Sequence, residues 1–185
     1  MMMEKQETLL INITNIQRRS EISQKLVYCI VKSSLRHLFC GSYGIDIIFC
    51  SPSHIKKLNK DYRNRNNITD ILSFEIKEYD NDIFYIGEIY IAPVVAENNF
   101  LRYRHFWEKA DWILRERSEG SPNIEKDDKR GFEKEIALLI IHGILHLFGY
   151  VHDEEHELDL DDEDYNKEMK DMQKLIYRDL AGLLG

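Results

Sequence analysis

Hydrophobic residues alternate or cluster in four short segments of the chain, and these segments predict β-strands. Leu9–Asn15 shows partial alternation, and Gly44–Cys50 is a run rich in β-branched residues. Ile71–Ile76 and Ile83–Ala92 flank a turn-forming run at residues 79–82, which favours a β-hairpin. We therefore expect a small sheet of about four strands.

Apolar residues at spacings of three and four predict two helices among these strands. Ser20 is the expected cap of the first helix, whose apolar stripe covers residues 22–35. Ser51, followed by a first-turn proline, is expected to cap a short helix that continues to about Lys60. Both helices would connect strands that are neighbours in the sequence.

Three longer helical patterns follow the hairpin. The first begins at about Pro93 and has a stripe that indicates core packing, formed by Phe100, Tyr103, Trp107, Ala110 and Leu114. The second, about Phe132–Phe148, is apolar on most sides and is expected to be central, and the third, Tyr165–Leu184, is amphipathic. Strands and about five helices over residues 1–185 predict one α/β or α+β domain.

Composition is consistent with a folded, soluble protein. The chain has 185 residues, 43% of them hydrophobic, and its longest apolar run has six residues against the ~20 that a membrane span needs. We expect no signal peptide and no contact with membranes. The three cysteines are an odd, sparse set that predicts buried free thiols, a reducing compartment and a cytoplasmic location.

Charge is distributed unevenly along the chain. The formal net charge is -8, but residues 153–164 hold nine acids in twelve positions, so the rest of the chain is nearly neutral. Residues 55–65 carry five lysines and arginines with Asp61 as the only acid. Either run is typical of a solvated face, and charge alone neither requires nor excludes an anionic partner such as RNA.

Four of the seven histidines fall between residues 142 and 156. His142 and His146 are four apart on the central helix, so their rings project from one face. Gly149 provides a helix stop, after which the chain can bring His152 towards that face. Three imidazoles with a fourth open position are typical of a catalytic zinc site, in which the metal lowers the pKa of its water to roughly 7. We predict one Zn²⁺ per chain, although nickel, copper or cobalt also accept three imidazoles, and expect His156 to be solvated.

The same histidine spacing occurs in the metzincin peptidases. Those enzymes place a glutamate directly after the first histidine as the general base, and this chain has Gly143 there. A glycine cannot accept a proton, so a zinc peptidase is the disfavoured alternative, open only if another part of the fold supplies a base.

Three blocks of sequence resemble one known family. The string HGILHLFGYVH at residues 142–152 is similar to the HGxLHLxGYxH signature of the YbeY family, the bacterial endoribonucleases of rRNA maturation. Residues 58–63 and 69–74 resemble the family's LNxxYR…T[DN]VLSF block, and residues 87–91 resemble its G[DE]IxI strand. The blocks occur in the family's order and cover most of residues 51–152.

This resemblance implies a single-domain α/β fold around a small mixed sheet, with one zinc on a central helix held by His142, His146 and His152. Arg63 would be the basic residue beside the metal that the family needs for activity. The implied activity is cleavage of single-stranded RNA, in 3′-end maturation of small-subunit (16S) rRNA and in ribosome quality control. Implied partners are the ribosome or its proteins, not DNA. A non-catalytic ribosome assembly factor with structural zinc stays the second alternative.

The chain departs from the family pattern at several places. Val151 stands where the family usually has aspartate, which removes a hydrogen-bonding partner of the metal ligands, and Asp153 is a candidate substitute. Glu75 replaces the usual proline after Ser-Phe, with little expected effect. Residues of about 101–131 form a longer helical insertion than the family's usual connection.

Overall fold

The computed structural model describes residues 7–99, 124–150 and 167–184. A helical segment at residues 93–99 accompanies the longer elements, so that five helices and four strands are described. These longer elements are, in chain order, β1 (Leu9–Asn15), α1 (Gln24–Leu38), β2 (Tyr43–Phe49), α2 (Pro52–Arg63), β3 (Ile71–Asp80), β4 (Ile83–Ile91), α4 (Ile124–Leu147) and α5 (Lys167–Leu184). The predicted α/β fold with about four strands and five helices is confirmed.

The four strands form one mixed sheet in the order β1-β2-β4-β3. β2 pairs in parallel with β1 and β4, and β3 pairs antiparallel with β4. The apolar residues Ile45, Ile47 and Phe49 of β2 are fully buried, because this strand has a neighbour on each side and helices below it. β3 is an edge strand.

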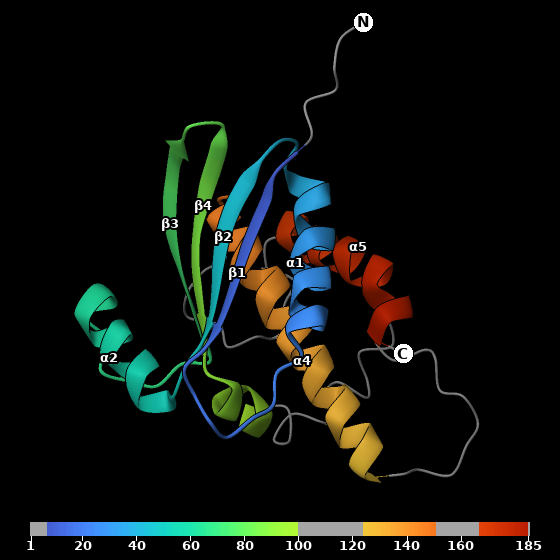
Figure 1. The fold of residues 1–185 in the computed structure, drawn as a ribbon. Helices are drawn as coiled ribbons and strands as arrows, with labels where there is room; N and C mark the ends of the chain where they lie inside the picture. The colour runs from blue at the N-terminus through green and yellow to red at the C-terminus, as the bar shows by residue number, and fades with distance from the viewer. Residues whose placement is uncertain (1–6, 100–123, 151–166, 185) are drawn as a thin grey trace, which may run out of the picture.

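Helices cover the two faces of the sheet unequally. α1, α4 and α5 lie together on one face, where they and the sheet enclose the main hydrophobic core (Figure 1). α2 lies apart from them, at the end of the sheet beside β3 (Figure 1). A second, smaller core beneath α2 consists of Cys50, Ile55, Leu72 and Ala92.

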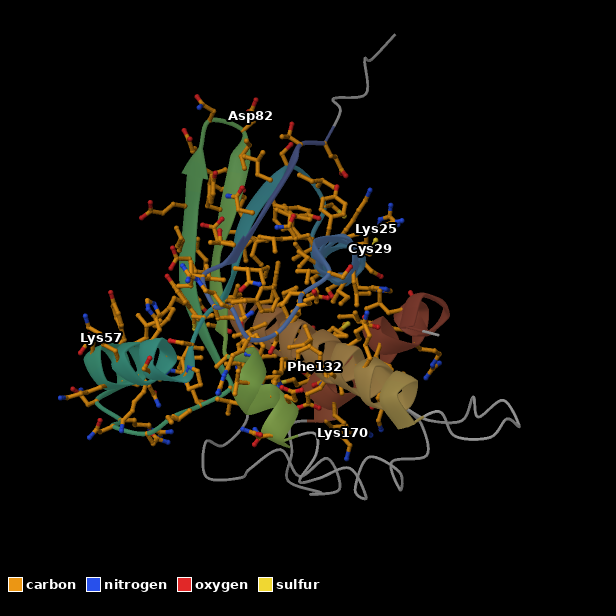
Figure 2. The ribbon with its side chains drawn as sticks, turned by 60° about the horizontal axis from the view of Figure 1, so that its bottom comes forward. Lys25, Cys29, Lys57, Asp82, Phe132 and Lys170 are labelled. Atoms are coloured by element: carbon orange, nitrogen blue, oxygen red, sulfur yellow. The ribbon has the colours of Figure 1, made fainter. Side chains whose placement is uncertain are left out.

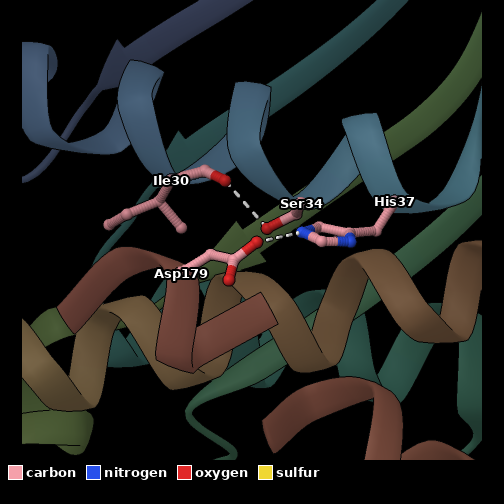
Figure 3. A network of polar contacts seen from close by, with 4 residues as sticks. All are labelled: Ile30, Ser34, His37 and Asp179. Atoms are coloured by element: carbon pink, nitrogen blue, oxygen red, sulfur yellow. Dashed lines mark hydrogen bonds and ion pairs between the residues drawn. The ribbon is translucent and has the colours of Figure 1, made fainter. Parts of the chain in front are cut away.

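α5 closes the main core against α1 and α4. Its buried residues Met169, Ile176 and Leu180 have no exposed surface. One ion pair joins α1 and α5, between His37 Nε2 and Asp179 Oδ2 at 2.8 Å (Figure 3). Because both partners are partly exposed, apolar packing contributes more to this contact than the charges do.

Some boundaries differ from the prediction for identifiable reasons. α1 is capped by Ser23, not Ser20, because Gln17 holds Ser20 in a preceding turn: Gln17 Oε1 accepts from the Ser20 amide and Gln17 Nε2 donates to the Ser20 carbonyl. α2 continues to Arg63 and is capped by Asn64 in the left-handed conformation. β3 and α4 are longer than expected.

Several predicted features lie outside the described residues. They are the aromatic stripe from residue 100 to 114, most of the predicted insertion, Val151, His152 and the acidic run 153–164. In the part of the chain that is described, no helix is long and apolar enough to cross a membrane. The cysteines are free thiols, but only Cys50 is buried and Cys40 is exposed, so the expectation of burial is wrong for Cys40.

Candidate functional site

α4 passes unusually close to the sheet at Gly143. A β-carbon there would lie 2.8 Å from Ile71 Cδ1, 3.0 Å from Ser73 Oγ and 3.1 Å from Ile89 Cδ1. Only glycine lets the helix approach β3 and β4 this closely without a shift of those side chains. The contact places α4, and with it the two histidines, close to β3 and β4.

His142 and His146 converge at this point. Their Nε2 atoms are 3.0 Å apart, and their rings meet edge to face with centroids 4.5 Å apart. His142 is 6% exposed, whereas His146 is partly exposed, so the pair lies at the margin of the core and is accessible from one side. The predicted juxtaposition of these two imidazoles on one helix face is therefore present.

The chain leaves α4 through a glycine turn directly after the second histidine. The Gly149 amide donates to the His146 carbonyl at 2.9 Å, and the Tyr150 amide donates to the Leu145 carbonyl at 3.1 Å. With φ of +83° at Gly149, these two bonds form a Schellman cap. The predicted helix stop is present, and the residue that follows it by three positions, His152, lies outside the described residues.

The two imidazoles fit a zinc ion by donor type and by spacing. With Zn–N bonds of about 2.0–2.1 Å and tetrahedral angles, two ligand nitrogens lie about 3.4 Å apart, within a few tenths of an ångström of the distance here. Neutral imidazole is a common ligand of such metals. Among the described residues no group of three ligand-type side chains is present, and the third predicted ligand, His152, lies outside them.

Arg63 lies on a different element. It is the last residue of α2, is exposed, and forms no ion pair with any described residue. The loop of residues 64–70 leads from it to β3, whose Ile71 and Ser73 border Gly143. One short stretch of chain thus joins Arg63 to the strand on which α4 packs at Gly143. No described hydrogen bond or ion pair connects Arg63 with the histidines.

A buried carboxyl group, Glu135, was not singled out by the sequence. It is 4% exposed and stands seven residues before His142, on the same face of α4. Burial, with a smaller contribution from Asp70, raises the pKa of Glu135 to about 8. The signal was an acid directly beside the apolar run 136–141. Asp70 itself accepts a hydrogen bond from Asn99 Nδ2 at 3.0 Å.

A mixed sheet is crossed by a helix that presents two converging imidazoles, which is a donor pair typical of a zinc-binding protein. The model of the family described as Endoribonuclease YbeY matches residues 11–114 and 123–181 of this chain. The chain belongs to this family, and the predictions of family and of an RNA-cleaving hydrolase are confirmed.

Individual relatives agree with the family match. The endoribonuclease YbeY of Thermotoga petrophila is 30% identical over 142 residues, which cover 77% of this chain and 71% of that protein. That of Alkaliphilus metalliredigens is 30% identical over 149 residues, covering 78% of this chain and 83% of the relative. The solution structure of TM1509 from Thermotoga maritima superposes with a TM-score of 0.51 at 27% identity, covering 94% of this chain and 91% of that one.

Proposed function

We propose that the protein is a zinc-dependent endoribonuclease specific for single-stranded RNA. It acts in the cytoplasm in 3′-end maturation of 16S rRNA and in ribosome quality control, with the ribosome or its proteins as partners. The convergence of His142 Nε2 and His146 Nε2 to 3.0 Å is the observation that carries this proposal. The family membership of the chain supports the substrate class.

His142, His146 and His152 hold the zinc in this proposal. When bound, the metal supplies Lewis acidity for cleavage of a phosphodiester bond. Gly143 lets α4 pack closely on β3 and β4 beside the first ligand, and the cap at Gly149 ends the helix after the second. Gly143 and Gly149 therefore both contribute to where the ligands lie.

Arg63 binds the phosphate. Its guanidinium is exposed and has no carboxylate partner among the described residues, so it is available for two parallel hydrogen bonds to a phosphate. A bidentate arginine also stabilises the negative charge that builds up on the phosphoryl oxygens during cleavage. Arg63 thus positions the scissile group and lowers the barrier.

The attacking group is either water or the 2′-hydroxyl of the RNA itself. Analysis of the product ends separates these routes, because attack by the 2′-hydroxyl leaves a 2′,3′-cyclic phosphate and attack by water does not. Peptide hydrolysis is disfavoured by the packing at Gly143. A glutamate at this position would bring its β-carbon to 2.8 Å from Ile71 Cδ1.

The test compares cleavage of a labelled single-stranded RNA with cleavage of the same sequence as a duplex. We expect the zinc-loaded wild type to cut only the single strand, and Arg63→Ala to lose activity roughly 100-fold while keeping bound zinc. Arg36→Ala removes another exposed arginine, from α1 on the other face of the sheet, and serves as the matched control. Equal activity of wild type and Arg63→Ala would contradict the role of Arg63, and equal cutting of the duplex would contradict strand specificity.

A further inference from the structure

Four ring side chains form a continuous row between α2 and the outer face of β3 and β4. The ring of Tyr62 lies 5.1 Å from that of Phe74, and Phe74 lies 5.8 Å from Tyr90. The imidazole of His54 stacks on Tyr90 with centroids 6.2 Å apart. We call these four residues the aromatic row. It lies above the small core beneath α2.

The two ends of the aromatic row are open to solvent. Tyr62 is 69% exposed and His54 is also exposed, whereas Phe74 and Tyr90 are partly buried between them. Tyr62 continues the sheet-facing stripe of Ile55 and Leu58 one turn beyond the core. Its ring packs against Phe74 at an interplanar angle of 60°, and most of its surface is open to solvent. Tyr62 therefore presents a large aromatic side chain at a position where the core does not need one.

A basic stripe on α2 borders the aromatic row. Lys56, Lys60 and Arg63 are spaced by four and three residues, which places them on one face of the helix. None of the three forms an ion pair with a described residue. Lys57 also projects from α2 at the periphery of the molecule (Figure 2). This side of the helix therefore presents uncompensated positive charge.

Acidic groups near the aromatic row lie on its other side. Tyr90 donates its hydroxyl to Glu88 Oε2 at 3.1 Å, and Glu75 is paired with Lys77 at 2.7 Å. Asp61, on α2, is the only acid within residues 55–65. The hairpin turn at Asp82 is at the end of β3 and β4 remote from α2 (Figure 2). A polyanion is consequently attracted to the α2 side of the row and repelled from the strand side.

We propose that the aromatic row and the basic stripe bind the RNA strand beside the cleavage site. An unpaired base stacks on the exposed ring of Tyr62, and Lys56 and Lys60 hold the adjoining phosphates, while Arg63, at the end of the stripe, contacts the scissile phosphate. Stacking of this kind tolerates any base, which suits a substrate defined by being single-stranded. This inference rests on the proposed function, because it assigns that substrate a second binding surface.

The path between the two surfaces follows from the alternation of β3. Ser73 faces α4 beside Gly143, and Phe74 faces the opposite side of the sheet. β3 is the edge strand, so an RNA strand that reaches both the histidines and Tyr62 passes around its free edge. A single strand is flexible enough to bend around this edge and present its bases to Tyr62, whereas the bases of a duplex are already stacked and paired.

The test is binding of a fluorescent oligouridine of about 12 nucleotides, compared with an oligonucleotide of equal length that lacks its bases. A chelator keeps the strands intact during the measurement. We expect Tyr62→Leu, which preserves an apolar contact with Phe74, to weaken oligouridine binding about tenfold and to leave binding of the abasic strand unchanged. Tyr62→Phe keeps the ring and should bind like the wild type.

Tyr79 supplies the matched control. It is 72% exposed and packs on Phe84 at 5.0 Å, but it lies at the hairpin end of β3. Tyr79→Leu should bind both strands like the wild type. Equal oligouridine affinity of Tyr62→Leu and wild type, or an equal loss for the abasic strand, would overturn the inference. Failure of the proposed function is separate, because it would show as absent cleavage in the zinc-loaded wild type with base-dependent binding intact.

Discussion

Gly143 and Ile71 touch across the interface between α4 and β3 so closely that a β-carbon on the glycine would lie 2.8 Å from Ile71 Cδ1. The pair sets how deeply the central helix sits on the sheet. Because His142 and His146 flank Gly143 on the same helix, the geometry of the candidate metal site depends on this contact between an aliphatic side chain and a bare backbone.

Gly143→Ala is therefore expected to destabilise the protein even though alanine favours helices. Overpacking lowers the free energy of unfolding by about 1–3 kcal/mol, and the higher helix propensity of alanine raises it by about 1 kcal/mol. Ile71→Val removes the Cδ1 atom in question, so the double variant should be more stable than the sum of the single changes by about 1 kcal/mol. Urea unfolding of the four proteins measures this coupling. Strictly additive effects would show that the two residues do not constrain each other.

Gly149→Ala tests the turn that follows the second histidine. Nothing lies within 4 Å of a β-carbon there, so the cost is that of a left-handed backbone at φ of +83°, about 1–2 kcal/mol. Gly149→Asn should cost less, because asparagine tolerates this conformation better than alanine does. Urea unfolding of both variants beside the wild type gives the comparison, and equal losses for the two substitutions would contradict the assigned cap.

Glu135 makes stability depend on pH in a direction opposite to that of most carboxylates. Its pKa is about 8 in the folded protein, against an ordinary value of 4.5, so the folded state binds more protons than the unfolded state between these values. The free energy of unfolding contributed by this group therefore falls as pH rises from about 4.5 to 8 and is level above that range.

Glu135→Gln removes this titration. The variant should lose less stability than the wild type between pH 6 and 8, by on the order of 1 kcal/mol or more. Thermal melts at several pH values measure the difference, and Glu133→Gln, two residues away and partly exposed, is the control. Parallel pH profiles for wild type and Glu135→Gln would mean that the carboxyl group does not stay protonated in the fold.

The strands and the central helix could be predicted because their apolar residues follow a simple period. Leu9–Asn15 is the strand that was expected, and the two histidines lie on the helix that was expected. Boundaries were harder because they depend on local hydrogen bonds. Gln17 hydrogen-bonds to the backbone of Ser20 and holds it in a turn, so Ser23 is the cap of α1. β3 continues to Asp80 because it pairs with β4 past a bulge, and its pattern alone ended at Ile76.

The candidate site was predictable only where its residues are close in sequence. Helix geometry alone predicts that His142 and His146 lie on one face, and Gly149 predicts the turn that ends the helix. The burial of Glu135 depends on how α4 sits in the core, and the contact of Tyr62 with Phe74 depends on how α2 packs against β3. Long-range packing of this kind has no local signature, although an acid beside an apolar helical run is a hint.

Stepwise addition of zinc to metal-free protein tests the central claim most directly. RNA cleavage and bound metal are measured in the same samples for wild type and His146→Ala, purified in parallel. The account predicts no cleavage by metal-free wild type, a rise that levels off at one zinc per chain, and neither binding nor cleavage by His146→Ala. Full cleavage by the metal-free protein, or equal cleavage by His146→Ala, would contradict a metal-dependent site at these histidines.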